Sequence, residues 1–365
     1  MKTVHKTIRR TVTILLSASI MMSSLSVLTS CRAKTVAYSD QFMGSFDTVI
    51  SIVAHQDSKV KFDEIYNYSK TRFEELHKLY DIYNLYPGVI NAKTINDNAG
   101  KRPVKIQKEL VDLLTLSIEW NKKSSGKFNI AFGSVLKIWH DYREMADPED
   151  ANAQIPTLQE LQAANKHVSI NDLVIDTAKS EVFIKDPKMQ IDLGAVAKGY
   201  ATELVANELK AKGYTNFAIS AGGNVEVVGY PAARDDKNWT IGIQDPQKPT
   251  NTDPNDGLIN KVRVIDTSVV TSGWYQRYYK SQGKIYHHII DPGTLFPQDY
   301  FQAVTVVYPN SGICDILSTI LMILPPDESY AFIKTIPGAK AFWILSDGTI
   351  KVSEGMNDLL IDKIK

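Results

Sequence analysis

The sequence is poor in cysteine and carries no excess of charge of either sign. Its 365 residues include two cysteines, and 41 basic residues balance 41 acidic ones. No run of Lys and Arg of the kind that follows a phosphate backbone is present, and no familiar nucleic-acid-binding motif occurs. Nucleic acid is therefore not expected as a partner, and a disulfide-rich scaffold is excluded.

Several common catalytic and metal-binding motifs are also missing. The chain holds no G-x-S-x-G, no phosphate-binding P-loop and no G-x-G-x-x-G. These absences disfavour serine hydrolases, P-loop NTPases and Rossmann dehydrogenases. His287 and His288 are adjacent, but no cysteine cluster or H-E-x-x-H helix accompanies them, so a zinc site is not expected.

Residues 1–30 have the pattern of an export signal. A basic start precedes a short, serine-rich apolar run, and Leu28-Thr29-Ser30 leads to Cys31. This pattern predicts a bacterial lipoprotein signal, with Cys31 lipidated as the first residue of the mature chain. A transmembrane anchor is the alternative, and the run is weakly apolar for a bilayer span of about 20 residues. The mature protein is then expected outside the cytoplasm, held on the cell membrane by lipid.

Removal of the signal changes the charge and the cysteine count. Lys2, Lys6, Arg9 and Arg10 would leave with a segment that contains no acid, so the 41 basic residues fall to 37 against 41 acidic ones. Cys314 would be the only cysteine left in the body, so no intramolecular disulfide is expected. Residues 31–40 are mostly polar and are predicted to be a mobile tether before a domain over residues 41–365.

Hydrophobic periodicity predicts one α+β domain, with two lobes around a cleft as a variant of that architecture. Helices are expected from a Ser58 cap to about residue 80, over 107–123, and from Asn310 or Ser311 to Pro325. Short strands separate these helices. Turn residues within apolar runs predict hairpins, for example over residues 341–350.

The stretch 190–202 is interpreted as the element around which the site is organised. A buried strand is predicted to end there and to open a helix over 195–209. Such a junction presents free backbone N–H groups and the positive end of a helix dipole, which both favour anions. Asp192 and Lys198 add opposite charges within one turn of it. The plain alternative is a capped helix with a surface lysine.

Three oxygen-bearing side chains lie on nearly one face of the helix expected after Ser311. They are Asp315, Ser318 and Thr319. Together with a backbone carbonyl from Ala195, these oxygens would suit Mg²⁺, a hard cation. The alternative is structural, because Ser and Thr inside helices commonly bond to carbonyls of their own helix.

Two further features allow both a functional and a structural interpretation. Gly222 and Gly223 form the turn of a predicted hairpin, which can admit a ligand or only reverse the chain. His287 and His288 would point to opposite faces of a strand over 286–290, so at most one ring enters a cleft. Asp291 is near enough to orient that ring, although a purely structural histidine pair is the alternative.

Short segments of the chain, taken in order, resemble the ApbE family of FAD:protein FMN transferases. The matching segments are residues 43–45 (MGS), 127–130 (KFNI), 191–200 (IDLGAVAKGY), 220–224 (SAGGN), 287–292 (HHIIDP) and 315–319 (DILST). The resemblance covers Phe42 to about Leu324, and its second and second-last long segments are the specific ones. It implies an ApbE-like, T-fold-like single α+β domain.

The resemblance also implies a reaction and its site. FAD would bind in the cleft, Mg²⁺ would bridge its pyrophosphate, and FMN would pass to a Thr or Ser hydroxyl of an acceptor flavoprotein, either a membrane redox subunit or an exported protein, with release of AMP. The residues expected to contact FAD are Met43, Tyr83, Lys127, Phe128, Asn129, Asp192, Lys198, Gly222, Gly223 and His288. The expected metal ligands are the Ala195 carbonyl, Asp315, Thr319 and Ser318, and the expected catalytic residues are His288 and Asp291.

The chain departs from the family pattern at several positions. Ser45 stands where many members have Thr, Ala195 where they have Gly, and Asn129 and Asn224 where they have Asp. Leu295 replaces the usual Gly of the loop after Asp291, which affects the expectation for acceptor recognition. Two other functions remain open from sequence: an FAD pyrophosphatase, with water in place of the acceptor, and a non-enzymatic flavin-binding lipoprotein.

Overall fold

The computed structural model describes residues 35–147, 152–233, 235–248 and 257–364. Residues from Val36 onward form one compact unit. The predicted single α+β domain is therefore confirmed, and it is not divided into two lobes. The predicted signal and the lipidated Cys31 lie outside the described residues.

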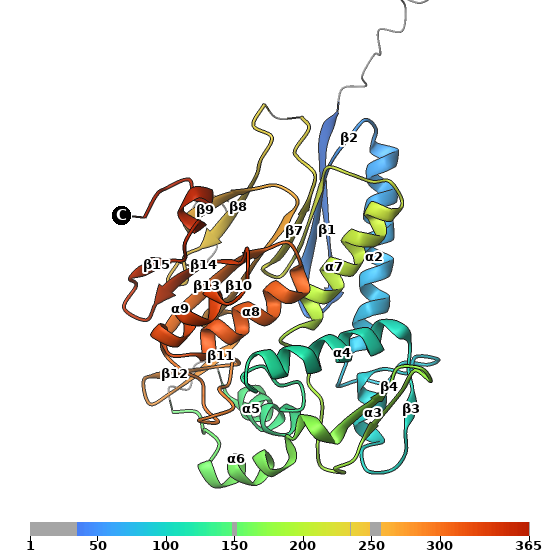
Figure 1. The fold of residues 1–365 in the computed structure, drawn as a ribbon, viewed down its shortest axis with the longest axis vertical. Coiled ribbons are helices and arrows are strands. Elements are labelled where there is room, and N and C mark those ends of the chain that lie inside the picture. Colours follow the sequence, from blue (N-terminus) through green and yellow to red (C-terminus); the bar gives the residue numbers. More distant parts are fainter. Residues whose placement is uncertain (1–34, 148–151, 234, 249–256, 365) are drawn as a thin grey trace, which may run out of the picture. The chain divides into compact units, whose positions relative to one another are not determined.

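An eight-stranded antiparallel sheet forms the centre of the domain (Figure 1), with the strand order β1-β2-β6-β7-β10-β13-β14-β15. Its strands are β1 (Val36–Ser45), β2 (Thr48–Gln56), β6 (Phe217–Ala221), β7 (Asn224–Val228), β10 (Thr267–Gly273), β13 (Phe301–Tyr308), β14 (Lys340–Leu345) and β15 (Ile350–Val352). Consecutive strands pair as hairpins at β1–β2, β6–β7 and β14–β15.

Smaller sheets surround this one. The three-stranded sheet consists of β3 (Val104–Lys105), β5 (Glu181–Ile184) and β4 (Leu173–Asp176), and the two-stranded ones are β8 (Trp239–Gln244) with β9 (Leu258–Val264) and β11 (Tyr278–Ser281) with β12 (Lys284–His287). The β4–β5 hairpin agrees with the strand pair predicted between residues 168 and 185.

The helices are α2 (Lys59–Tyr80), α3 (Ala92–Asp97), α4 (Lys108–Lys123), α5 (Gly133–Met145), α6 (Leu158–Ala164), α7 (Ala197–Ala211), α8 (Ser311–Ile323), α9 (Pro326–Lys334) and α10 (Met356–Leu359). Short 3₁₀ helices lie at Asn165–His167, Ile170–Asp172 and Trp274–Gln276. In the described part of the chain, no helix combines the length and the apolar character needed to cross a bilayer.

Local signals set the ends of the principal helices. The Ser58 hydroxyl caps α2 by accepting the N–H of Lys61, and the Asn310 side chain caps α8 by accepting the N–H of Ile313 at 2.8 Å. Gly213 ends α7 with a φ of 88°, a left-handed conformation that glycine adopts without steric cost. These boundaries agree with the sequence-based prediction.

The sheet is covered on both faces. Helices α2, α7 and α8 pack against one face, where they share the largest buried apolar cluster with residues of the central strands (Figure 1). The β8–β9 hairpin and α10 cover the other face through a second cluster that includes Trp239, Val262 and Met356. The burial of both faces fixes the strands and so holds their ends in place at the site.

Close contact between α7 and α8 depends on a glycine. A Cβ atom at Gly199 would lie 2.4 Å from the carbonyl oxygen of Ser311 and 2.6 Å from the Cβ of Asp315. Any larger residue would therefore push the two helices apart. Gly199 places the first turn of α7 directly against Asp315.

The predicted tether over residues 31–40 is wrong from Val36 onward. Val36 pairs with Gln56, and the ladder continues along β1 and β2 toward the turn that follows Ser45. The side chains of β1 are mostly exposed, so the segment lacks the apolar pattern of a buried strand. Backbone hydrogen bonds to β2 hold it at the edge of the sheet instead.

Glu226 supplies a test of the core that is independent of function. The side chain is 2% exposed on β7 and accepts a hydrogen bond from the Ser268 hydroxyl. Burial, with a smaller contribution from the charge of Glu203, raises the pKa of Glu226 to about 8. Because the folded-state pKa lies above the unfolded value, the carboxyl group favours folding at low pH and opposes it as the pH rises through about 8.

Glu226→Gln is therefore expected to flatten the pH dependence of stability. Relative to the wild type, the free energy of unfolding of the variant should increase by roughly 3 to 5 kcal/mol between pH 4.5 and pH 9. Urea unfolding of both proteins at the two pH values measures this difference. Parallel changes in the two proteins would show that Glu226 does not titrate as described.

Candidate functional site

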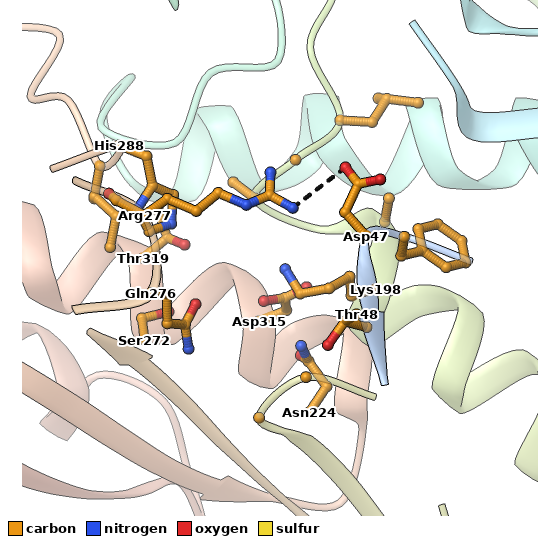
Figure 2. Close-up of a pocket in the computed structure, with 18 of the residues that line it drawn as sticks. Asp47, Thr48, Lys198, Asn224, Ser272, Gln276, Arg277, His288, Asp315 and Thr319 are labelled. Atoms are coloured by element: carbon orange, nitrogen blue, oxygen red, sulfur yellow. Dashed lines mark hydrogen bonds and ion pairs between the residues drawn. The ribbon is translucent and has the colours of Figure 1, made fainter. Parts of the chain in front are cut away.

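A cavity of about 860 Å³ lies where α5, α7 and α8 meet the turns of the central sheet. Its wall includes most of the residues expected from sequence: Tyr83, Lys127, Phe128, Asn129, Asp192, Ala195, Lys198, Gly222, Gly223, His288, Asp315 and Thr319. Segments far apart in the chain therefore converge on one site. Figure 2 shows how ten labelled polar side chains of this wall are arranged.

Three expected residues do not line the cavity. Met43 lies on β1 with 74% of its surface exposed, away from the wall. Ser318 is fully buried, and its hydroxyl bonds to Ser272 Oγ at 2.7 Å and to the Asp315 carbonyl at 3.0 Å. The structural alternative is thus correct for Ser318, and Asp291 is buried beside the cavity rather than in its lining.

The segment before α7 is a turn, and the predicted strand is wrong. Gln190 makes only an isolated bridge to Phe132. The backbone of Ile191 instead bonds to the side-chain amide of Asn96, at 2.8 Å from its N–H and 3.0 Å to its carbonyl. Asp192 then accepts the N–H of Gly194 at 2.7 Å, and this turn delays the start of α7 to Ala197 rather than Ala195.

Asp315 and Lys198 bring opposite charges together beside the start of α7. Asp315 is 4% exposed, and its Oδ2 accepts the N–H of Gly199 at 2.9 Å. Burial raises the pKa of Asp315, against the lowering effect of the Lys198 charge. Figure 2 shows the two side chains next to each other in the cavity. A buried carboxylate that is disfavoured in its charged form gains stability from a cation.

Thr319 lies one helical turn after Asp315 and behaves differently from Ser318. It lines the cavity, and within the described residues its hydroxyl has no hydrogen-bond partner. Ala195 lines the same cavity. The described residues hold no group of three His, Cys, Asp or Glu side chains that could bind a metal. A cation here would therefore depend on one carboxylate, a hydroxyl and backbone oxygen, a donor set that suits Mg²⁺.

His288 reaches the cavity although the predicted strand over 286–290 is wrong. The strand β12 ends at His287, and the carbonyl of Arg277 then accepts both the backbone N–H and Nδ1–H of His288 at 3.1 Å each. Burial lowers the pKa of His288 to about 3, and the charge of Lys198 adds to this effect. The ring is therefore neutral, and its Nε2 is free to accept a proton.

His287 has a structural environment. Its Nε2 bonds to the carbonyl of Gln298 at 2.9 Å, and its Nδ1 accepts the N–H of Ile289 at 3.2 Å. The residue is 6% exposed, and burial lowers the pKa of the ring. Only one of the two adjacent rings faces the cavity, as alternation predicted.

The loop after Asp291 is held by polar contacts. Asp291 Oδ1 accepts from Lys127 Nζ and from the N–H of Gly293, both at 3.0 Å. Leu295 has a φ of 68°, the left-handed region that glycine favours, and its side chain is buried. Trp139 donates its indole N–H to the Leu295 carbonyl at 2.9 Å. The loop thus keeps a glycine-like backbone conformation despite the leucine.

The Gly222-Gly223 turn has both of the roles considered from sequence. The φ values of 55° and 91° reverse the chain between β6 and β7, and both residues line the cavity. A Cβ atom at Gly222 would lie 2.3 Å from Thr48 Oγ1. Glycine is therefore required for Thr48 and the turn to pack together.

Asn224, directly after this turn, has an unsatisfied oxygen in the cavity wall. The side chain is 2% exposed, and its Oδ1 has no partner among the described residues. An unpaired buried acceptor of this kind costs about 1 to 3 kcal/mol. Figure 2 shows Asn224 near Lys198 and Thr48. A polar ligand that donates a hydrogen bond would recover this cost.

Sequence reasoning missed several polar residues of the wall. Asp47 lies in the β1–β2 turn, where Phe46 and Asp47 have φ values of 55° and 51°, and such strain in non-glycine residues is concentrated at functional sites. His140 and Arg143 come from α5, and Arg277 follows the last 3₁₀ helix. No motif joins these residues, so only their positions in the fold reveal them.

Comparison with known proteins gives consistent results. A sequence profile described as ApbE family matches residues 46–343. An FAD:protein FMN transferase of Treponema pallidum is 32% identical over 72% of this chain and 73% of the relative. A Klebsiella pneumoniae protein with the same description is 26% identical over 88% of this chain and 92% of the relative.

Solved structures show the same fold. The ApbE protein of Thermotoga maritima superposes with a TM-score of 0.75 at 25% identity, over 87% of this chain and 97% of that chain. The flavin transferase ApbE of Vibrio cholerae superposes with a TM-score of 0.71 at 22% identity, over 89% of this chain and all of that chain.

Proposed function

Since the chain belongs to the ApbE family, we propose that it transfers FMN from FAD to a Thr or Ser hydroxyl of an acceptor flavoprotein, releases AMP and uses Mg²⁺. One observation carries the proposal: Asp315, Lys198 and Thr319 meet beside the first turn of α7 in a single large cavity. Phosphoryl transfer depends mainly on positioning and on charge neutralisation, which this arrangement can supply.

The cavity provides space and polar anchors for a dinucleotide. Its volume of about 860 Å³ lies within the usual range for ligand pockets. Lys198 and the free N–H groups at the start of α7 favour the phosphates. Asn224 offers an unpaired acceptor, and the Lys127–Asp291 ion pair fixes the neighbouring segment over 127–130.

The residues present fit a magnesium ion. Asp315, Thr319 and the Ala195 carbonyl would hold it, and the raised pKa of Asp315 reflects a carboxylate that a cation would stabilise. When bound, Mg²⁺ neutralises the charge that develops on the pyrophosphate. Ser318 has no part in this set, because its hydroxyl is already bonded within the core.

His288 is the candidate proton acceptor. The acceptor hydroxyl attacks the phosphorus of the FMN half, the bond to AMP breaks, and His288 Nε2 takes the hydroxyl proton. The Arg277 carbonyl fixes the ring tautomer that leaves Nε2 unprotonated. The pKa of about 3 belongs to the cavity without phosphates, whose negative charge would raise it toward the working pH.

Transfer can be tested with the lipid-free domain. The protein is incubated with FAD, Mg²⁺ and a tagged candidate acceptor, and covalent flavin fluorescence is sought on a denaturing gel. We expect a fluorescent acceptor band that chelation removes. No labelling of any Thr- or Ser-bearing acceptor, together with FAD left intact, would contradict the proposal.

An FAD pyrophosphatase is the second candidate, because water can occupy the position of the acceptor hydroxyl in the same site. Release of AMP without acceptor, at a rate that acceptor does not change, would favour it. A flavin-binding lipoprotein without activity is less consistent with the site, since a pure carrier needs no carboxylate and hydroxyl placed for a metal.

The lipoprotein signal remains a separate proposal. Leu28-Thr29-Ser30-Cys31 motivates it, and it lies outside the described residues. Cys31→Ala is expected to abolish labelling of the protein by radioactive fatty acid and to release it from the membrane fraction. Labelling that persists in the variant would exclude lipidation at Cys31, and with it the proposed anchoring outside the cytoplasm.

A further inference from the structure

Two arginines at the cavity have only weak carboxylate partners. Arg143 is 17% exposed, and its ion pair with Glu144 is long, at 3.7 Å, to a side chain that is 64% exposed. Arg277 pairs with Asp47 at 3.4 Å, and Asp47 is 79% exposed. Such exposed pairs hold their partners weakly. Both guanidinium groups are therefore available to a better anion.

The two positive charges act on each other. Burial lowers the pKa of Arg143, and the charge of Arg277 is the next cause. Asp192 lies within electrostatic range of both, but within the described chain it forms no ion pair with either, and its Oδ1 accepts the N–H of Gly194. Like charges that face one cavity without a close counter-charge favour an incoming anion.

The structure also fixes the position of Arg143. Its Nη2 donates to His140 Nδ1 at 2.8 Å, and the His140 ring packs on the Tyr83 ring with centroids 4.9 Å apart. Tyr83 is 53% exposed, so this cluster lies toward the solvent side of the cavity. An arginine held by a side-chain hydrogen bond loses little conformational freedom when it binds a ligand.

Arg277 connects this cluster with the reacting centre. Its carbonyl holds the backbone and the ring of His288, while its side chain extends toward Asp47. Figure 2 shows the guanidinium group on the open side of Lys198 and Asp315. A group bound by Arg277 would therefore lie next to the place where the acceptor hydroxyl must arrive.

We propose that Arg143 and Arg277 form a subsite for the carboxylate of an acidic side chain in the acceptor polypeptide, close to the residue that receives FMN. The inference rests on the proposed transfer to a protein acceptor. Exposure favours this occupant over the nucleotide, whose phosphates are matched by Lys198 and the start of α7 at the buried Asp315. Asp47 occupies Arg277 in the free protein and is displaced by the incoming carboxylate.

Peptide binding tests the subsite without any need for turnover. The probes are fluorescein-labelled hexapeptides with one Thr, an Asp placed at each other position in turn, and Gly and Ser elsewhere; matched peptides carry Asn or Lys instead of Asp. Fluorescence anisotropy is measured with FAD and Mg²⁺ present. The proteins are the wild type, Arg143→Gln, Arg277→Gln, and the control Arg263→Gln, a β9 residue that pairs with Asp236 away from the cavity.

We expect the wild type and Arg263→Gln to bind at least one Asp peptide about tenfold more tightly than its Asn counterpart, with Lys weakest. Both cavity variants should lose this preference, while FAD affinity, followed by flavin fluorescence, changes less than about twofold. Asp47→Asn should strengthen binding of the same peptide.

Two results would overturn the inference. One is the absence of any preference for Asp in the wild type, or its persistence in Arg143→Gln and Arg277→Gln. The other is weaker FAD binding in these variants with unchanged peptide binding, which would assign the arginines to the nucleotide. A normal Asp preference with no FMN transfer to any acceptor would instead contradict only the proposed function.

Discussion

Replacement of Asp315 by Asn is expected to lower the rate of FMN transfer on the order of 10²- to 10³-fold, with a smaller effect on FAD affinity. The carboxylate is the only acidic group that α8 contributes to the cavity wall, and Asn keeps its shape but removes the charge that would hold Mg²⁺. The amide oxygen can still accept the N–H of Gly199, so the contact between α7 and α8 survives.

The same substitution should not weaken the fold. Burial raises the pKa of Asp315 above its ordinary value, so the folded-state pKa exceeds the unfolded one and the ionised group opposes folding as the pH rises. Asp315→Asn should thus melt at the same temperature as the wild type or higher at neutral pH. Loss of activity together with a gain in stability is typical of a residue kept for function.

Ser318→Ala is the matched control for this experiment. Ser318 lies on the same helix, but its hydroxyl bonds to Ser272 and to a carbonyl of its own helix. Its loss should reduce stability by about 1 kcal/mol and leave transfer per folded molecule within a few-fold of the wild type. Transfer rates by Asp315→Asn that equal those of Ser318→Ala would contradict the assignment of the metal site.

His288→Ala is expected to reduce transfer on the order of 10²- to 10⁴-fold, while His287→Ala should mainly destabilise the protein. His288 faces the cavity with a free Nε2, whereas both ring nitrogens of His287 are bonded within the loop. Loss of the buried His287 contacts should cost about 1 to 3 kcal/mol. Initial rates are compared below the melting temperature of each variant, with the folded fraction taken from circular dichroism.

The pH profile adds a second measurement for this pair. If His288 accepts the proton, kcat should fall at low pH in the wild type, and the acidic limb of the profile should disappear in His288→Ala. His287→Ala should keep that limb. An unchanged acidic limb in His288→Ala, or the greater loss of activity in His287→Ala, would contradict the role given to His288.

Local patterns in the sequence were sufficient to predict many of the elements. Ser58 and Asn310 cap their helices through hydrogen bonds to residues three positions later, and the Gly222-Gly223 turn needs only its own φ values. These interactions lie within a few residues, so a single sequence contains all the information they require. The converging site residues were predictable only through the family resemblance.

Errors arose where distant side chains replaced local partners. The backbone of Ile191 bonds to the Asn96 amide, 95 residues away, so an apolar segment that resembles a strand has no ladder. Ser318 and Thr319 are neighbours in the sequence, yet Ser272 on β10 draws one hydroxyl into the core and leaves the other in the cavity. Periodicity contains no information about such contacts.

The arginine subsite has the same origin. Arg143 and Arg277 are 134 positions apart, from Arg143 on α5 and Arg277 near β11, and neither belongs to a motif. Their common exposure to one cavity follows from the fold alone. Residues of this kind are the ones for which the structure adds most to the sequence.

The central claim is transfer of FMN to a protein hydroxyl, and the ratio of its products tests it most directly. The lipid-free domain is incubated with FAD, Mg²⁺ and an acceptor; AMP is quantified by chromatography, and acceptor-bound FMN is quantified by intact mass spectrometry. The account predicts equimolar AMP and protein-bound FMN, both lost in Asp315→Asn. AMP accompanied by free FMN, with no mass added to the acceptor, would contradict it and identify the protein as an FAD hydrolase.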